Sequence, residues 1–194
     1  MEQLKKLKNK NIQILDIATG SGCIALTFAH HLPESLVVAT DISAQALQLA
    51  QENSRHNKTY NVEFIESDLF SAIVAKKQFD IIVANPPYIA ESEKNDLDES
   101  VTAWEDRRAL FAPDNGLGFI KQIIDSAPLY IKNNEEMKHY NIPQLAIEIG
   151  YQQGEYVTAY MRAAGYNEVH IYKDLEQKDR VVVGRIDYVA NSNA

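Results

Sequence analysis

Short apolar runs alternate along this chain with longer amphipathic segments, and this pattern limits the fold more than any other feature. The runs IQILDI and DIIVA are apolar on both faces, which is typical of parallel strands covered by helices on both sides. We therefore predict a doubly wound α/β fold around a mostly parallel, seven-stranded Rossmann-like sheet with helices on both faces. The predicted strands are residues 12–17, 36–40, 62–66, 79–84, 144–149, 169–172 and 181–186, and the predicted helices are residues 23–31, 44–56, 117–131 and 154–164.

The end of the chain departs from the parallel pattern. The last two predicted strands are joined by KDLEQKDR, which is too short for a crossover helix, so the last strand should be antiparallel. Residues 90–115 and 133–143 have no clear period and are predicted to be long loops. The chain contains no linker or internal repeat, and we expect residues 1–194 to form a single domain.

Composition narrows the range of partners. The net charge of −8 opposes the sign of a general nucleic-acid binder, so direct nucleic-acid binding is not expected. No apolar run reaches the roughly 18–20 residues of a membrane span and the start does not read as a signal peptide, so we expect no membrane partner. A single cysteine, Cys23, excludes an internal disulfide and favours a cytoplasmic location. The five histidines show no metal-ligand spacing, and no metal is expected.

A glycine-rich turn follows the first predicted strand, and it consists of Ala18, Thr19, Gly20, Ser21 and Gly22. Glycines without a Cβ let the backbone turn sharply and approach a ligand closely, and the next helix adds free N–H groups. The dinucleotide fingerprint G-x-G-x-x-G is incomplete because Ala25 stands at its third glycine position, which argues against a pyrophosphate grip. A tight turn with glycines for packing alone is the alternative.

Acidic residues follow the second and third predicted strands. Asp41 could accept both hydroxyls of a ribose, or it could cap the next helix together with Ser43. Asp68 could accept from an adenine amino group while Leu69 lies on the ring, although an aspartate is common at a strand end. Since these residues and the glycine-rich turn follow successive strands, they predict a nucleoside site at one sheet edge. Without a phosphate grip, S-adenosyl-L-methionine fits this site better than NAD.

The fourth predicted strand ends at Asn85, Pro86, Pro87 and Tyr88. The Asn85 side chain and the Pro86 carbonyl are acceptors, and Pro87 stiffens the step between them and Tyr88. Such a rigid pair of acceptors could hold an NH₂ group, with Tyr88 against the flat group that carries it. An amide nitrogen is a poor nucleophile because of resonance, so catalysis would rest on positioning and charge stabilisation. The alternative is a polyproline turn with no catalytic role.

The order of these motifs resembles class I S-adenosylmethionine-dependent methyltransferases, in which NPPY is shared by enzymes that methylate planar nitrogens. More of the chain is similar to one branch, the peptide chain release factor N5-glutamine methyltransferases. The similar segments span most of residues 12–186, and they are ILDIATGSGCIAL, ATDIS, NVEFIESDLF, FDIIVANPPYI, RRALFAPDNGLGFI, LAIEIGYQQGE and YKDLEQKDRVVVGR.

The resemblance implies methylation of the glutamine in the GGQ loop of class 1 peptide chain release factors, with S-adenosyl-L-homocysteine as the second product. The cofactor-binding residues that it implies are Ala18, Thr19, Gly20, Ser21, Gly22, Asp41, Asp68, Leu69 and Asn85. The substrate-binding residues that it implies are Asn85, Pro86, Pro87 and Tyr88, of which Asn85, Pro86 and Tyr88 are the expected catalytic residues.

The chain departs from this family at several points. Ala18 stands where the family usually has glycine, and KNNEEMKHYNIP is expected to lengthen a surface loop. The family carries an N-terminal helical docking domain, whereas only about ten residues precede the first predicted strand here, so we expect this sequence to cover the catalytic domain only. Alternative substrates are a ribosomal protein glutamine or an amino group of a nucleic-acid base (adenine N6 or guanine N2). An alternative of another class is a non-catalytic S-adenosylmethionine-binding module.

Overall fold

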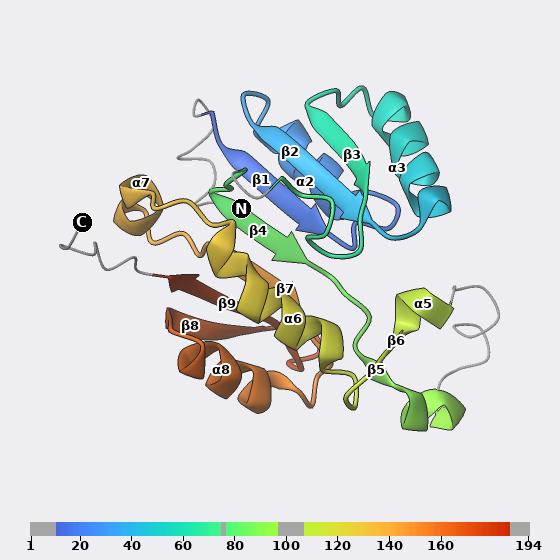
Figure 1. The fold of residues 1–194 in the computed structure, drawn as a ribbon, viewed down its shortest axis with the longest axis vertical. Coiled ribbons are helices and arrows are strands. Elements are labelled where there is room, and N and C mark those ends of the chain that lie inside the picture. The colour runs from blue at the N-terminus through green and yellow to red at the C-terminus, as the bar shows by residue number, and fades with distance from the viewer. Residues whose placement is uncertain (1–10, 75–76, 97–106, 187–194) are drawn as a thin grey trace.

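The computed structural model describes residues 11–74, 77–96 and 107–186, so both predicted domain ends lie outside the described residues (Figure 1). Its main sheet contains seven strands in the order β3-β2-β1-β4-β7-β9-β8. These strands are β1 (Gln13–Ile17), β2 (Leu36–Asp41), β3 (Val62–Glu66), β4 (Ile81–Ala84), β7 (Leu145–Glu148), β8 (Tyr166–Lys173) and β9 (Asp179–Ile186). β9 is antiparallel to both of its neighbours, whereas the other neighbouring pairs are parallel, which confirms the predicted fold class.

Helices cover both faces of this sheet, as predicted. They are α2 (Cys23–His31), α3 (Ala44–His56), α6 (Gly118–Ser126) and α8 (Gly154–Ala163). Figure 1 shows α6 and α8 in front of the sheet and α2 behind it. The predicted helix at residues 117–131 is shorter than expected: α6 ends at Ser126, and the 3₁₀ turn η2 (Ala127–Leu129), which contains Pro128, follows. A proline removes a helical N–H and favours such an ending.

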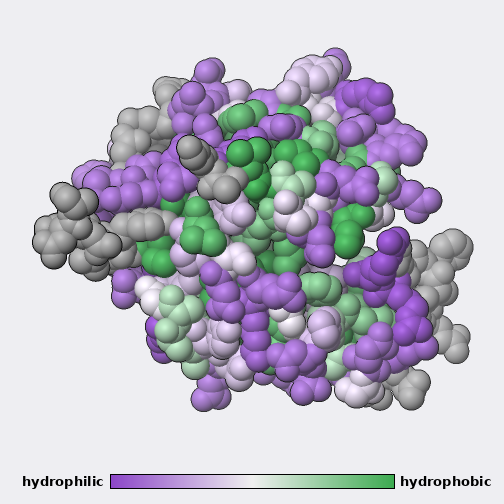
Figure 2. Space-filling model, in the orientation of Figure 1, coloured by the Kyte–Doolittle hydropathy of each residue, from purple (hydrophilic) through white to green (hydrophobic). Residues whose placement is uncertain are grey.

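Each face of the sheet has its own hydrophobic core. In β4, Ile82 and Ala84 pack in the core that α6 and α8 cover, whereas Ile81 and Val83 pack in the core that α2 covers. Side chains alternate between faces along a strand, so a strand that is buried on both faces must be apolar throughout. Figure 2 shows hydrophobic residues in the middle of the viewed face and hydrophilic residues around its rim. Among the described residues, no helix has the length and apolar character needed to cross a membrane.

The first predicted loop, residues 90–115, contains short regular elements. They are η1 (Glu91–Asp96), α5 (Arg107–Leu110) and β6 (Phe111–Ala112), and β6 pairs in parallel with β5 (Ile89–Ala90). The middle of this segment, residues 97–106, lies outside the described residues. A strand of two residues has no measurable period, so this pairing was not detectable from the sequence.

The prediction of a surface loop at residues 133–143 is wrong. This segment contains α7 (Glu135–His139), and it buries Met137 and Ile142 in the same core as α2. Two polar residues fasten its start to the buried Asp80. Asn134 Nδ2 donates to Asp80 Oδ1 at 2.6 Å, and Lys132 Nζ lies 3.2 Å from Asp80 Oδ2. Two isolated apolar residues give no helical period, so only tertiary packing reveals that the segment belongs to the core.

Replacement of Met137 by alanine tests this anchoring. We expect Met137→Ala to lower the free energy of unfolding by about 2–5 kcal/mol, because the side chain is fully buried and its removal leaves a cavity. The exposed neighbour His139→Ala should change it by less than about 1 kcal/mol. Urea denaturation of both variants measures the difference. Equal values for the two variants would contradict a core role for this segment.

Candidate functional site

The glycine-rich turn lies at the carboxyl edge of the sheet, between β1 and α2. Ala18, Gly20 and Gly22 all have positive φ, at 56°, 56° and 84°. The Thr19 N–H donates to the Thr40 carbonyl at 2.9 Å, which fastens the turn to β2. A left-handed residue other than glycine costs about 1–2 kcal/mol, so Ala18 adds strain to this turn that a glycine would avoid.

The two glycines of this turn have different surroundings. A Cβ on Gly22 would lie 3.0 Å from the Cβ of Ala50, so its absence lets the glycine-rich turn lie close to α3. A Cβ on Gly20 would have no heavy atom within 4 Å and would point into open space. Gly22 therefore has a packing role, as the alternative interpretation held, while Gly20 leaves room beside the backbone.

Asp16 organises the turn from below, and sequence reasoning did not select it. Its Oδ2 accepts hydrogen bonds from Thr19 Oγ1 at 2.6 Å and from the Ala25 N–H at 3.0 Å. Its Oδ1 is buried and has no hydrogen-bond partner within the described ranges. Burial raises the pKa of this carboxyl to about 7, and the nearby Asp41 adds to the rise. The buried run ILDI, in which an aspartate interrupts apolar residues, was the available signal.

Asp41 joins the glycine-rich turn to the start of α3. Its Oδ2 accepts from the Gly20 N–H at 2.8 Å, and its Oδ1 accepts from the Ser43 N–H at 2.9 Å. Ser43 is the N-cap of α3, as predicted, and accepts from the Ala46 N–H. Asp41 thus bonds to the N-cap residue itself, and Ser43 rather than Asp41 accepts from an N–H of α3. Each carboxylate oxygen can accept a second hydrogen bond, so ribose binding stays a prediction.

The turn after β3 lies next to Asp41. The Ser67 N–H donates to the Asp41 carbonyl at 2.9 Å, which keeps the ends of β2 and β3 together. Ser67 Oγ donates to the Leu69 carbonyl and accepts from the Ala72 N–H, so this side chain links the two ends of the turn. Asp68 is exposed, whereas Leu69 is partly buried against the core. Both predicted residues therefore lie at the same edge as the glycine-rich turn.

The Asn85–Tyr88 turn leaves the sheet beside the glycine-rich turn. Ala84, the last residue of β4, is in register with Ile17 of β1, so Asn85 and Ala18 follow adjacent strand ends. Asn85 is exposed, and its side chain has no hydrogen bond to the described residues, whereas Pro86 is buried. The structure thus brings the four predicted segments to one edge, where the outline in Figure 2 is indented between the halves that contain α3 and α5.

Tyr88 contacts residues that sequence reasoning did not assign. Its hydroxyl donates to Glu148 Oε1 at 3.4 Å and accepts from Arg180 Nη1 at 3.4 Å. Gln153 Nε2 donates to its carbonyl at 3.0 Å. Burial raises the pKa of the phenol, and Glu148 raises it further, so the hydroxyl is a neutral donor. The resembling segments LAIEIGYQQGE and YKDLEQKDRVVVGR contain all three partners, but the resemblance gave them no role.

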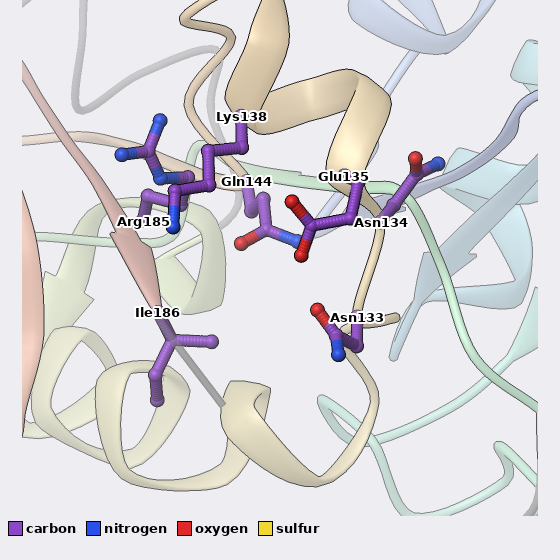
Figure 3. A pocket seen from close by; sticks show the side chains of 7 residues that line it. All are labelled: Asn133, Asn134, Glu135, Lys138, Gln144, Arg185 and Ile186. Atoms are coloured by element: carbon purple, nitrogen blue, oxygen red, sulfur yellow. The ribbon is translucent and has the colours of Figure 1, made fainter. Parts of the chain in front are cut away.

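The opposite edge of the sheet has a different character. A cavity of about 40 Å³ opens there, and Figure 3 shows polar side chains from the start of α7 facing the end of β9 across it. Its lining residues are Asn133, Asn134, Glu135, Lys138, Gln144, Arg185 and Ile186. This space suits water molecules rather than a nucleoside. In the described part of the chain, no three His, Cys, Asp or Glu residues are grouped as metal ligands would be.

Comparison with solved structures identifies the class of this fold. The chain is similar to the ribosomal protein L11 methylase of Lactobacillus delbrueckii subsp. bulgaricus, with a TM-score of 0.64 at 20% identity over 96% of this chain and 76% of that one. The fold is therefore that of a Rossmann-like methyltransferase. The family model for the methyltransferase small domain matches residues 1–103, which is more than half of the chain. The chain belongs to the methyltransferase small domain family.

Two curated relatives extend the similarity beyond these residues. A release factor glutamine methyltransferase of Lactococcus lactis subsp. lactis is 39% identical over 180 residues, which is 92% of this chain and 63% of the relative. A bifunctional methyltransferase of Rickettsia typhi is 37% identical over 183 residues, which is 94% of this chain and 33% of the relative. The chain thus spans between one third and two thirds of the length of these relatives.

The buried carboxyl of Asp16 predicts a pH dependence of stability. Between about pH 4 and pH 7, the folded protein keeps a proton on Asp16 that the unfolded chain releases. The free energy of unfolding should therefore fall as the pH rises through this range, by an amount on the order of 4 kcal/mol from this group.

Asp16→Asn should flatten this fall, because the amide does not titrate, while the exposed Glu34→Gln should keep it. Urea denaturation at a series of pH values measures the slope. A slope that is unchanged in Asp16→Asn would show that Asp16 is charged in the folded protein at neutral pH.

The two glycines of the turn allow a matched comparison. Gly20→Ala and Gly22→Ala both place a side chain at positive φ and share that strain, but only Gly22→Ala brings a Cβ to 3.0 Å from Ala50. We expect Gly22→Ala to lower the free energy of unfolding by about 1–3 kcal/mol more than Gly20→Ala does. Thermal and urea unfolding measure both variants. Equal destabilisation would mean that the contact between the glycine-rich turn and Ala50 tolerates the extra methyl group.

Proposed function

We propose that the chain transfers a methyl group from S-adenosyl-L-methionine to the side-chain amide nitrogen of a glutamine in the GGQ loop of a class 1 peptide chain release factor. The observation that carries the proposal is the exposed Asn85 at the start of a proline-stiffened turn, beside the glycine-rich turn. The similarity to a release factor glutamine methyltransferase over 92% of this chain supports the substrate.

The residues around the glycine-rich turn fit a nucleoside cofactor. Gly20 leaves open space beside its backbone, Asp41 keeps acceptor capacity for two hydroxyls, and Asp68 is exposed for an amino group. Leu69 offers an apolar surface next to Asp68. The buried, unpartnered Oδ1 of Asp16 is an additional polar atom beneath the same turn. When bound, S-adenosyl-L-methionine supplies an electrophilic methyl group on a sulfonium and leaves as S-adenosyl-L-homocysteine.

Asn85 and Pro86 prepare the substrate nitrogen. The Asn85 side-chain oxygen and the Pro86 carbonyl accept the two N–H bonds of the glutamine amide, which holds the nitrogen in one orientation. They also stabilise the positive charge that grows on this nitrogen as its lone pair forms the new bond. Pro86 has no N–H of its own that would compete, and Pro87 keeps the two acceptors fixed relative to each other.

Tyr88 and the prolines shape the pocket around the amide. Pro87 and Tyr88 are partly exposed, so they offer apolar surface to the flat carboxamide, while the buried Pro86 fixes the turn beneath them. The neutral Tyr88 hydroxyl adds no charge beside the cationic methyl donor. Once methylated, the cationic amide nitrogen is strongly acidic and loses its proton to solvent without a dedicated base.

Asn85→Ala separates catalysis from cofactor binding. We expect the methylation rate to fall by about 10²–10³-fold, since one preorganised acceptor at the reacting nitrogen is lost. Calorimetry should show a much smaller change in the dissociation constant of S-adenosyl-L-methionine. Asn57→Ala, which removes an exposed asparagine after α3, is the matched control and should leave the rate unchanged. An equal loss of rate and of cofactor affinity in Asn85→Ala would assign Asn85 to the cofactor instead.

The substrate is tested with radiolabelled cofactor. The full chain is incubated separately with a purified class 1 release factor, ribosomal proteins, DNA and RNA, and labelled products are mapped by mass spectrometry. The proposal predicts label on the release factor and its loss when the GGQ glutamine is replaced by alanine. Label on nucleic acid alone, or on a ribosomal protein alone, would overturn it, and cofactor binding without any transfer would favour the non-catalytic alternative.

A further inference from the structure

The Asn85–Tyr88 turn has few ways to be held in place. Pro86 and Pro87 have no N–H, so two consecutive residues cannot donate hydrogen bonds. The Asn85 side chain is free of hydrogen bonds to the described residues. The side-chain hydrogen bonds that the structure gives to residues 85–88 all meet at Tyr88. The position of the turn therefore depends on what holds Tyr88.

Gln153 holds the backbone end of Tyr88. Its Nε2 donates to the Tyr88 carbonyl at 3.0 Å, while its Oε1 accepts from the Gly150 N–H at 2.9 Å. The side chain thus links the loop after β7 to the turn after β4. A Cβ on Gly116 would lie 2.2 Å from the Tyr88 carbonyl oxygen and 2.9 Å from Gln153 Nε2, so only glycine leaves room for this contact.

Arg180 holds the ring end of Tyr88 together with Glu148. Glu148 accepts from the Tyr88 hydroxyl, and Arg180 Nη1 donates to the same hydroxyl. Antiparallel pairing sets Glu148 opposite Val181, which brings Arg180 of β9 to the same end of β7. Asp174 fixes the guanidinium through contacts at 3.1 Å and 3.3 Å, and the Ile149 carbonyl accepts from Nη1. Arg180 is thus anchored independently of Tyr88.

We propose that Gln153 and Arg180 are positioning residues, which clamp Tyr88 at its two ends and so hold Asn85 in the orientation that methyl transfer requires. The proposal rests on the proposed function for its kinetic consequences. Neither residue touches the reacting atoms; each acts through Tyr88. A misplacement of about 1 Å at a reacting group can cost about 10²-fold in rate, so a loosened clamp should appear in kcat.

The backbone end is tested with Gln153→Glu. This change keeps the acceptor for the Gly150 N–H and replaces the donor to the Tyr88 carbonyl with an oxygen that repels it. We expect kcat for release factor methylation to fall by about 10- to 10²-fold, with a KM for the release factor and a cofactor dissociation constant within about threefold of the unchanged chain. Gln152→Glu makes the same change of charge at the exposed neighbour and should have kcat within about twofold.

The ring end is tested with a double-mutant cycle of Arg180→Lys and Tyr88→Phe. Because Arg180 acts through the Tyr88 hydroxyl, Arg180→Lys should lower kcat in the unchanged chain but by less than about twofold in the Tyr88→Phe background. If the losses of kcat in the two single variants multiply in the double variant, Arg180 does not act through Tyr88. That result would overturn its role as a positioning residue. The proposed function is tested separately, by asking whether the unsubstituted enzyme labels the glutamine of the release factor. That result does not depend on the coupling between Arg180 and Tyr88.

Hydrogen exchange gives a readout that does not need catalysis. In Gln153→Glu, the backbone amides of residues 88–90 should exchange at least about tenfold faster than in Gln152→Glu, because the turn loses its anchor. Unchanged exchange in Gln153→Glu together with unchanged kcat would overturn the clamp. If the unsubstituted chain transfers no methyl group, the proposed function is wrong. The hydrogen-exchange result still decides whether Gln153 holds the turn.

Discussion

The parallel register of β1 with its two neighbours is the constraint on which the rest of the site depends. Ile17 is paired with Thr40 on one side and with Ala84 on the other, so three strands end at the same level. Parallel strands point their carboxyl ends to one edge, and the turns that follow them must meet there. Residues that are far apart in the chain, such as Asp41 and Asn85, therefore share one edge without any direct bond between them.

The buried carboxyl of Asp16 holds the glycine-rich turn in place, and the free-energy cost of burying this group depends on pH. Asp16 lies beneath the glycine-rich turn and ties it to the start of α2 through Thr19 and Ala25. Burial of a charged carboxylate is unfavourable, and the raised pKa shows that the folded protein relieves this cost by keeping the proton near neutral pH. Asp41, half-exposed above it, remains bonded to two backbone N–H groups and faces the edge.

The antiparallel part of the sheet contacts the Asn85–Tyr88 turn, whereas the parallel strands β1 and β2 hold the glycine-rich turn. β9 runs opposite to β7, so its first residues lie at the carboxyl edge, where a parallel strand would place its last ones. This reversal brings Arg180 to Tyr88, and the loop after β7 brings Gln153 to it. The direction of one strand thus decides which side chains can hold the turn.

The sequence by itself determined the strands of the main sheet, the helices α2, α3, α6 and α8 and the segments of the candidate site, because strand period, helix caps and glycine turns are local properties. It located the seven strands, the Ser43 cap and the position of Asn85 after the fourth strand. Only the tertiary structure decided which distant residues meet. Packing places Met137 in the core, and β6 pairs with β5. Strand register brings Glu148 and Arg180 to Tyr88, from which they are separated by 60 and 92 positions in the chain. Contacts of this kind leave no period in the sequence, so only the folded chain reveals them.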